Sequence, residues 1–253
     1  MENFKTETFN KSFLRTFLKS LPFFNKLLKN LNIQYERDKF VVSELSQLKQ
    51  NSLLLDAGCG NQRYRAACSH LKYRSQDFGE YTSDDVETLG TDSMGFDGGY
   101  KYGKLDYKGD IWDVDEKDQT FNAILCTEVL EHIPYPNETI AEFSRLLKQG
   151  GKLILTAPNA CLRHMNPYFF YTGFSDVWYK KILEKNNFQV NKISPVGDYY
   201  RYMAVETART MALSSFFVKI IIFPSFLYFY LKKRTKLSTN TLCIGYHVIA
   251  TKK

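Results

Sequence analysis

From Ser52 onward, short apolar runs alternate along the chain with longer segments of helical periodicity. This alternation is typical of βαβ units, and it predicts a mostly parallel sheet with helices on both faces. The predicted strands are residues 53–57, 73–78, 122–127, 152–157, 188–195 and 242–250, with a weaker one at 105–109. Residues 51–253 are therefore expected to form one α/β domain.

Between the predicted strands at 122–127 and 152–157, the apolar positions follow a helical period. Asn137 is predicted to be the N-cap of this helix, and the pair Gly150–Gly151 is predicted to end it. The buried face of the helix is predicted to consist of Ile140, Phe143, Leu146 and Leu147.

Residues 1–50 are predicted to form a helical region that precedes the domain. Residues 11–33 have the pattern of a basic amphipathic helix that is bent or broken near Pro22. An apolar face of this kind packs on the core of a protein or lies on a membrane surface, and the pattern leaves both open.

Two further segments interrupt the alternation. Residues 79–103 are polar, glycine-rich and aromatic, and they are expected to form a long surface loop that can act as a lid. Residues 211–231 are apolar with a single charge and are long enough to cross a bilayer. Four basic residues follow this apolar segment, namely Lys232, Lys233, Arg234 and Lys236.

A membrane crossing at 211–231 conflicts with the predicted sheet. It would place the strands at 188–195 and 242–250, which are expected to pair, on opposite sides of the membrane. We therefore expect a helical insertion at residues 204–237, which either forms a hairpin broken at Pro224 and dips into one leaflet or lies on the surface. The alternative is a homodimer interface or a cap on the sheet.

The net charge of +7 is unevenly distributed. Residues 1–50 hold nine Lys and Arg against five Asp and Glu, residues 201–253 hold nine against one, and residues 51–200 hold sixteen against twenty-one. A nucleic-acid-binding domain would carry a basic stripe, so nucleic acid is not an expected partner. Basic ends beside apolar runs suit an anionic membrane surface instead.

The cysteines and the N-terminal residues indicate the cellular compartment of the protein. The five cysteines are scattered and form no Cys-x-x-Cys pair, which argues for a reducing compartment and against a zinc site. The N-terminus opens with an acidic residue and lacks an early apolar run, so no cleaved signal peptide is expected. The expected location is cytoplasmic, with peripheral contact to the inner face of the membrane through 11–33 and 211–236.

A glycine-rich turn follows the first predicted strand, in the sequence LLLDAGCGNQRYR at residues 53–65. In an open parallel sheet, ligands bind at the carboxyl ends of the strands, where Asp56, Gly58 and Gly60 stand. A dinucleotide fingerprint would have a third glycine at the position of Arg63, and a P-loop would end in Gly-Lys-Ser/Thr. Neither pattern is present, so phosphate binding is disfavoured.

The acids beside this turn favour a different ligand. A carboxylate at Asp56 would repel a pyrophosphate but suits a ligand with a cationic amine. Asp77 ends the next predicted strand, and from that position an acid can accept hydrogen bonds from a ribose diol. A ribose and a cationic amine without a phosphate describe S-adenosylmethionine (SAM).

Five blocks, in this order and spacing, resemble the class I SAM-dependent methyltransferases of the broad type-11 group. They are the turn at 56–60, Asp77, the segment 109–111, FNAILCTEVLEHIPYP at 121–136 and LLKQGGKLILTAPN at 146–159. The resemblance extends from about residue 52 to residue 196. It implies a three-layer α/β sandwich with a seven-stranded sheet, in which six strands are parallel and the last is antiparallel.

The resemblance also implies roles for individual residues. The cofactor-binding set would be Asp56, Gly58, Gly60, Asp77, Asp110, Ile111, Cys126 and Thr127. Asp110 would bond the adenine amine, Ile111 would pack on the ring, and Cys126 and Thr127 would line the methionine side. The residues themselves leave a turn role for Asp110 and a core role for Cys126 open.

Residues 163–190 resemble the acceptor-side segment of bacterial members of this group, many of which lie in surface-polysaccharide pathways. Tyr168, Tyr171 and Phe174 would then bind the acceptor by stacking, although core packing is equally open. Methyl transfer needs a general base only when the acceptor atom is a hydroxyl or an acidic carbon. His132 and His164 are the candidates, and a structural role for each histidine is the alternative.

The predicted function is methyl transfer from SAM to a small-molecule acceptor, a sugar or a lipid-linked intermediate, at the cytoplasmic membrane face. The alternative is a SAM-binding or degenerate methyltransferase-like subunit that serves as a membrane-docked partner protein.

Overall fold

The computed structural model describes residues 31–81 and 102–253. The chain divides into two units, Met1–Asp38 and Lys39–Lys253. Helix α3 (Ile33–Ser46) begins in the first unit and ends in the second. Most of the amphipathic helix predicted at 11–33, and most of the lid predicted at 79–103, lie outside the described residues.

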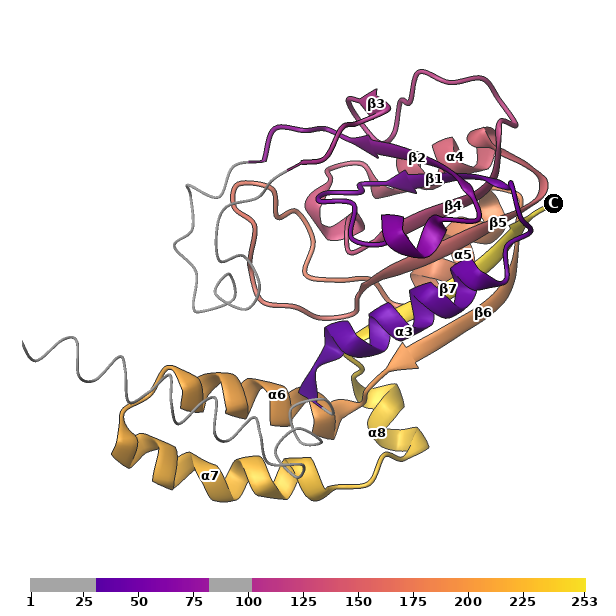
Figure 1. The fold of residues 1–253 in the computed structure, drawn as a ribbon. Coiled ribbons are helices and arrows are strands. Elements are labelled where there is room, and N and C mark those ends of the chain that lie inside the picture. Colours follow the sequence, from indigo (N-terminus) through magenta and orange to yellow (C-terminus); the bar gives the residue numbers. More distant parts are fainter. Residues whose placement is uncertain (1–30, 82–101) are drawn as a thin grey trace, which may run out of the picture. The chain divides into compact units, whose positions relative to one another are not determined.

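The second unit is built on a seven-stranded sheet with the strand order β3-β2-β1-β4-β5-β7-β6 (Figure 1). The strands are β1 (Leu53–Ala57), β2 (Lys72–Asp77), β3 (Tyr107–Lys108), β4 (Phe121–Thr127), β5 (Leu147–Pro158), β6 (Phe188–Val196) and β7 (Gly245–Lys252). Strand β7 runs antiparallel to its two neighbours, and the other pairs are parallel. The predicted fold class is confirmed, including the pairing of the last strand with β6.

Helices cover both faces of this sheet. On one face, Leu55 belongs to a hydrophobic cluster with residues of α4 (Pro136–Leu146) and α5 (Asp176–Lys185). On the other face, Leu54 packs with Val41 and Leu45 from the second half of α3 and with the short 3-10 helix η1 (Arg65–Cys68). Because successive strand side chains point to opposite faces, one strand contributes to both clusters and the unit has three layers.

Helix α4 begins at Pro136, with Tyr135 as its N-cap, so the prediction of Asn137 as the N-cap is wrong. Proline is favoured at the first helical position because the N–H group there has no partner within the helix. Asn137 consequently lies inside the first turn.

The end of α4 also differs from the prediction. The helix ends at Leu146, and Gly150 and Gly151 lie within β5 instead of terminating the helix. The physical reason is that Leu147 already pairs with Phe121 of β4, so the chain enters the sheet at once. The predicted buried positions are confirmed, since Ile140, Phe143, Leu146 and Leu147 are fully buried.

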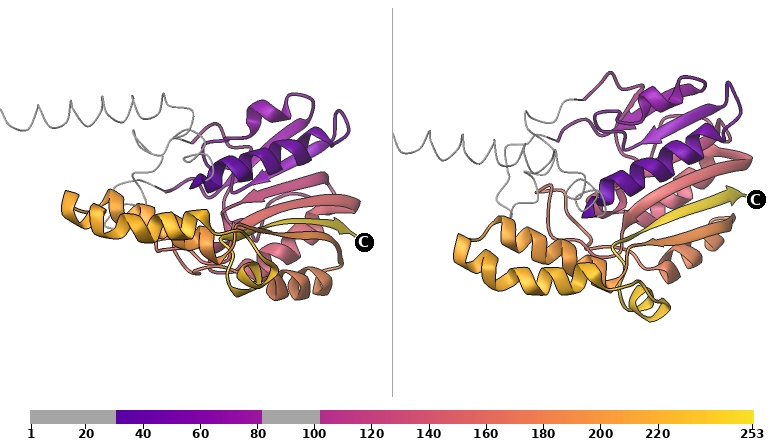
Figure 2. Two further views of the ribbon diagram at one scale, coloured as in Figure 1. Left: turned by 90° about the horizontal axis from the view of Figure 1, so that it is seen from below. Right: turned by 60° about the horizontal axis from the view of Figure 1, so that its bottom comes forward.

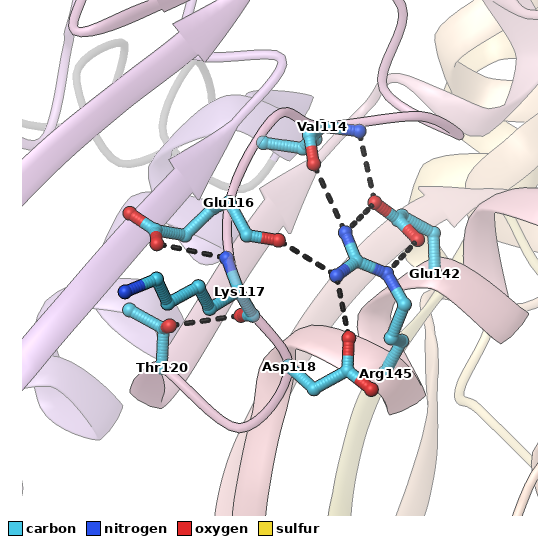
Figure 3. A network of polar contacts seen from close by, with 7 residues as sticks. All are labelled: Val114, Glu116, Lys117, Asp118, Thr120, Glu142 and Arg145. Atoms are coloured by element: carbon cyan, nitrogen blue, oxygen red, sulfur yellow. Dashed lines mark hydrogen bonds and ion pairs between the residues drawn. The ribbon is translucent and has the colours of Figure 1, made fainter.

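The loop between β3 and β4 is fixed to α4 by Arg145 (Figure 3). The guanidinium donates to the backbone carbonyl oxygens of Val114, at 2.9 Å, and Glu116, at 2.7 Å. It also pairs with the carboxylates of Glu142 and Asp118, at 2.7 Å and 2.8 Å. A planar guanidinium can make these bonds simultaneously because its donors point in several fixed directions.

The chain between β6 and β7 forms three helices among the described residues, and the apolar segment 211–231 lies mainly in the second of them. Helix α6 (Tyr199–Ala212) and helix α7 (Phe216–Leu231) lie side by side and extend away from the sheet (Figure 2), and α8 (Lys236–Thr241) leads back to β7. The helical insertion therefore starts before the predicted residue 204. The hairpin turn lies at 213–215, so the prediction of a break at Pro224 is wrong.

Pro224 lies inside α7, where it removes one backbone hydrogen bond without ending the helix. The chain turns instead at Ser214, whose hydroxyl donates back to the carbonyl of Thr210 at 2.6 Å, as serines do near helix ends. Among the described residues, no helix combines the length and the apolar character needed to span a bilayer.

Candidate functional site

The glycine turn lies at the carboxyl end of β1 and passes close to the loop after β4. Gly58 and Gly60 have φ angles of 68° and 52°, in the left-handed region that favours glycine. A Cβ atom at Gly58 would lie 2.4 Å from Cγ2 of Val129, in the loop after β4. The backbone therefore passes this loop at a distance that only glycine permits.

The neighbouring strand β2 holds the turn in place. The carboxylate of Asp77 accepts hydrogen bonds from the amides of Gly60, at 2.8 Å, and Gly79, at 3.2 Å, and also from the hydroxyl of Tyr102. Burial raises the pKa of Asp77, and these donors oppose the rise. The acid predicted to face a ribose diol thus also anchors the turn, and Tyr102 occupies one side of its carboxylate.

Gln76 was not singled out by the sequence, although it directly precedes Asp77. Its side-chain oxygen accepts from the amide of Gly58, at 3.1 Å, and its side-chain nitrogen donates to the carbonyl of Gly109, at 2.7 Å. This amide links the glycine turn to the segment that leads into Asp110. Gln76 therefore joins the glycine turn at 56–60 to the segment 109–111, both of which belong to the methyltransferase motifs.

Asp56 is buried near the carboxyl end of β1. Its side chain is only 2% exposed, and its carboxylate accepts a 2.6 Å hydrogen bond from the hydroxyl of Tyr73 on β2. Burial raises the pKa of Asp56 to about 7, although the bond from Tyr73 opposes this. Asp56 thus supports the turn from inside the protein, and its interaction with a cationic amine stays a prediction.

The remaining predicted cofactor residues divide into exposed and buried positions. Asp110 is exposed after β3, and Thr127 is half-buried at the end of β4, so both are accessible to a ligand. Ile111 is 4% exposed and Cys126 is fully buried in the hydrophobic core. Because β4 is buried on both faces there, Cys126 has the core role that the sequence left open, and its place on the methionine side stays a prediction.

The two predicted catalytic histidines lie together. The rings of His132 and His164 meet edge to face, with their centroids 4.6 Å apart. Nδ1 of His132 is 2.6 Å from the carbonyl of Tyr168, and Nδ1 of His164 is 2.8 Å from the carbonyl of Leu162. Burial, and next the proximity of His164, lowers the pKa of His132 to about 4.

Glu131 was not predicted and completes this group. It is 1% exposed, and its Oε1 atom lies 3.6 Å from Nε2 of His132. The only signal in the sequence is its position next to His132 in the segment EVLEHIP, which does not reveal that His164 will join them.

The three predicted acceptor residues have three different surroundings. Tyr168 lies beside the histidines through its carbonyl, and its ring meets that of Phe78 edge to face at 4.9 Å. Tyr171 is exposed and donates to the carbonyl of Pro134. Phe174 is 5% exposed and belongs to the core cluster, which favours the core-packing alternative for this residue. Packing against α5 buries its ring, which lies 4.5 Å from that of Trp178.

Comparison with known families agrees with this arrangement. A model of the methyltransferase domain matches residues 32–193, which is more than half of the chain. The chain belongs to the methyltransferase-domain family. The predicted class, the SAM-dependent methyltransferases, is confirmed, and the cofactor is SAM. A relationship to surface-polysaccharide enzymes is not among these findings.

Relatives match shorter stretches. The chain is 48% identical over 44 residues to the ubiquinone biosynthesis O-methyltransferase of Xanthomonas oryzae, which is 17% of this chain and 18% of that protein. It is 30% identical over 147 residues to an uncharacterized protein of Methanocaldococcus jannaschii, covering 54% and 55% of the two chains. The chain thus spans less than a fifth of the named O-methyltransferase and about half of the second relative.

Solved structures share the fold at low identity. A geranyl diphosphate methyltransferase in complex with geranyl diphosphate and sinefungin superposes with a TM-score of 0.53 and 15% identity, over 86% of this chain and 78% of the other. The [4+2]-cyclase SpnF superposes with a TM-score of 0.52 and 16% identity, over 86% and 81%. Because one of these proteins is a cyclase, the fold alone does not fix the reaction.

Proposed function

We propose that the protein transfers the methyl group of SAM to a hydroxyl group of a small-molecule acceptor, a sugar or a lipid-linked intermediate. The observation that carries this proposal is the pair His132 and His164, which lies beyond the carboxyl ends of β4 and β5 in a SAM-dependent methyltransferase domain. A group that activates a hydroxyl is needed there for O-methylation. The relatives named as O-methyltransferases support this type of acceptor atom.

The residues around the glycine turn fit the cofactor. The backbone at Gly58 and Gly60 approaches without side chains, and Asp77 presents a carboxylate at the adjacent strand end. If the hydroxyl of Tyr102 moves away, the same carboxylate can accept hydrogen bonds from a ribose diol. Asp110 and Thr127 are the accessible residues proposed for the adenine and methionine ends.

Bound SAM supplies an electrophilic methyl group on a sulfonium. The task of the chain is to align the acceptor oxygen with that methyl group and to manage the proton of the hydroxyl. Since His132 and His164 both direct Nδ1 to a backbone carbonyl, Nε2 of either ring is the atom that can interact with the hydroxyl. Tyr168 lies beside them through its carbonyl, and the proposed acceptor-side aromatic residues stay Tyr168, Tyr171 and Phe174.

We further propose that α7 docks the protein on the cytoplasmic face of a membrane, together with residues 11–33. Large apolar side chains of this helix are exposed, among them Phe216, Phe217, Ile220, Ile221 and Phe223. Basic residues follow at the end of the helix, and Nζ of Lys232 lies 4.7 Å from the ring centre of Tyr228. An apolar face beside clustered cations suits anionic lipid, where a lipid-linked acceptor would be found.

The test of the proposed reaction is turnover of SAM labelled on the methyl group. Purified protein is incubated with cell extract separated into lipid and aqueous fractions, and both S-adenosylhomocysteine and labelled product are measured. Product is expected with the wild-type protein and is expected to fall strongly for His132→Ala and His164→Ala, with SAM affinity retained. SAM binding without turnover would favour the alternative, a partner protein that no longer catalyses transfer.

A further inference from the structure

We propose that Glu131, His132 and His164 bind a divalent transition-metal ion, and that this ion activates the acceptor hydroxyl. This inference rests on the proposed methyl transfer and specifies how the same site works. One ligand atom from each of the three residues lies within 4.8 Å of the others. Glu131 comes from the 3-10 helix η4 (Leu130–His132), and His164 comes from the loop after β5.

The orientation of both rings is the first argument for a metal ion. Backbone carbonyls only accept hydrogen bonds, so the contacts from Nδ1 of His132 and of His164 require a hydrogen on each Nδ1 atom. In a neutral ring, this leaves the lone pair on Nε2. Metal-binding histidines characteristically donate their other ring nitrogen to a carbonyl or carboxylate, which fixes the tautomer and the ring orientation. Both histidines of this group satisfy that condition.

The burial of the acid is the second argument. Glu131 is 1% exposed and stands 3.6 Å from Nε2 of His132, so it is not one of the solvated surface acids that often cluster without a ligand. A buried carboxylate is stabilised when a cation lies nearby.

The distances suit a single ion after small movements. Ligand atoms that surround one tetrahedral ion at about 2.0–2.2 Å lie about 3.3–3.6 Å apart, so the present spread of up to 4.8 Å requires shifts of about 1–1.5 Å. His164 belongs to a loop, which can supply such a shift.

The donor set selects the kind of ion. Two imidazoles and one carboxylate are typical of Zn²⁺ and its first-row relatives, whereas Mg²⁺ and Ca²⁺ prefer oxygen ligands. Three protein ligands leave a coordination position open, as in catalytic zinc sites. The scattered cysteines argue against a thiolate zinc site, and the proposed ligands include no cysteine.

The open position would hold the acceptor oxygen. A hydroxyl bound to the ion loses its proton to water more readily, because the cation stabilises the resulting anion. A lone pair of this oxygen then forms the bond to the methyl carbon. The bond between that carbon and the sulfonium sulfur breaks, and its electron pair remains on the sulfur of S-adenosylhomocysteine.

The direct test is metal binding by the full chain without an affinity tag. Protein treated with EDTA and freed of chelator is titrated with Co²⁺ and followed by visible absorption, and Zn²⁺ is then added as a competitor. One Co²⁺ per chain is expected, with displacement by Zn²⁺. His164→Ala and Glu131→Gln are each expected to weaken binding about tenfold or more. His70→Ala removes another of the four histidines and should bind like the wild type.

The outcomes separate this inference from the proposed function. Absence of saturable Co²⁺ and Zn²⁺ binding, or equal binding by the wild type and His164→Ala, would overturn the metal site. Each variant is also titrated with SAM, and unchanged affinity shows that it is folded. If metal-free protein methylates the extract as fast as metal-loaded protein, the ion has no catalytic role and the proposed function stands. If metal binds but SAM does not, the proposed function fails.

Discussion

The amide of Gly60 donates a 2.8 Å hydrogen bond to the carboxylate of Asp77, so the ends of β1 and β2 are joined by the residues that define the cofactor motif. The same carboxylate accepts a second bond from the amide of Gly79. The acid proposed to bind the cofactor therefore also fixes the shape of the glycine turn.

Replacement of Asp77 by Ala is expected to weaken SAM binding by about 1.5–3 kcal/mol, the contribution of charge-assisted hydrogen bonds, which corresponds to a factor of about 10–150. Isothermal titration calorimetry with SAM measures the change. The matched control is Asp115→Ala, which removes an exposed acid from the loop before β4 and should leave the affinity unchanged. Unchanged affinity for Asp77→Ala would remove this residue from the cofactor site.

Replacement of Gly58 by Ala is expected to destabilise the protein by about 2–4 kcal/mol and to abolish SAM binding, because backbone strain and a clash act together. Gly150→Ala is the control, since its φ of 74° imposes similar strain but a Cβ there meets no atom within 4 Å. Thermal unfolding of both variants separates the two effects. Adding Val129→Ala to Gly58→Ala should recover part of the stability, and no recovery would contradict the clash.

The buried carboxylate of Asp56 predicts a dependence of stability on pH. Its pKa is raised to about 7 in the folded protein from 3.8, so its contribution to stability is complete below pH 4 and is lost as the pH rises through 7. Asp56→Asn is expected to remove this loss and to stabilise the protein at pH 8 by on the order of 3 kcal/mol relative to the wild type. Urea denaturation at pH 5 and pH 8 is the measurement, and a difference that does not grow with pH would contradict the assignment.

Arg145 is predicted to stabilise the loop that follows Asp110. Arg145→Met removes the bonds to two backbone carbonyls and leaves Glu142, which is 8% exposed, without its cation. The expected loss is about 2–3 kcal/mol in the free energy of unfolding. Urea denaturation measures the loss, with Arg74→Met, at an exposed ion pair with Asp106, as the control that changes stability little.

Membrane docking by α7 is tested by liposome flotation. Phe217→Asp and Ile221→Asp together remove two side chains that are 77% and 74% exposed, and each is worth about 1.5–3 kcal/mol on insertion. Binding to anionic liposomes should fall about a hundredfold or more, and wild-type binding should weaken with salt. Val177→Asp changes an apolar residue that is 63% exposed on α5 and should float like the wild type. Failure of the wild type to bind would favour a dimer interface.

The features that the sequence predicted correctly depend on residues close to one another along the chain. The alternation of apolar runs located each strand of the sheet, although β5 starts at Leu147 and not at the predicted residue 152. The position of Asp77 beside the turn followed from motif spacing. The partner of Asp56 could not be predicted in this way, because it depends on the register in which Leu54 pairs with Tyr73. The burial of Cys126 is visible only once β4 is known to be covered on both faces.

The group formed by Glu131, His132 and His164 also depends on contacts between segments that lie far apart in the sequence. His132 and His164 were singled out separately, and their meeting depends on how the loop after β5 returns to η4. The amides of Phe170 and Tyr171 donate to the carbonyl of Glu131 and bring that loop back. No periodicity in the sequence encodes these contacts, so Glu131 was missed although it is adjacent to a predicted residue.

The insertion formed by α6, α7 and α8 leaves the sheet at the end of β6 and rejoins it at the start of β7, and these two strand ends are paired. Val196 and Gly245 are paired, the amide of Ile244 donates to the carbonyl of Val196 at 2.9 Å, and the hydroxyl of Ser238 donates to Asp198 at 2.6 Å. Because its two ends meet, the length and composition of this insertion can vary at a small cost in loop entropy while the strands keep their register. Evolution can therefore exchange these three helices independently of the methyltransferase sheet.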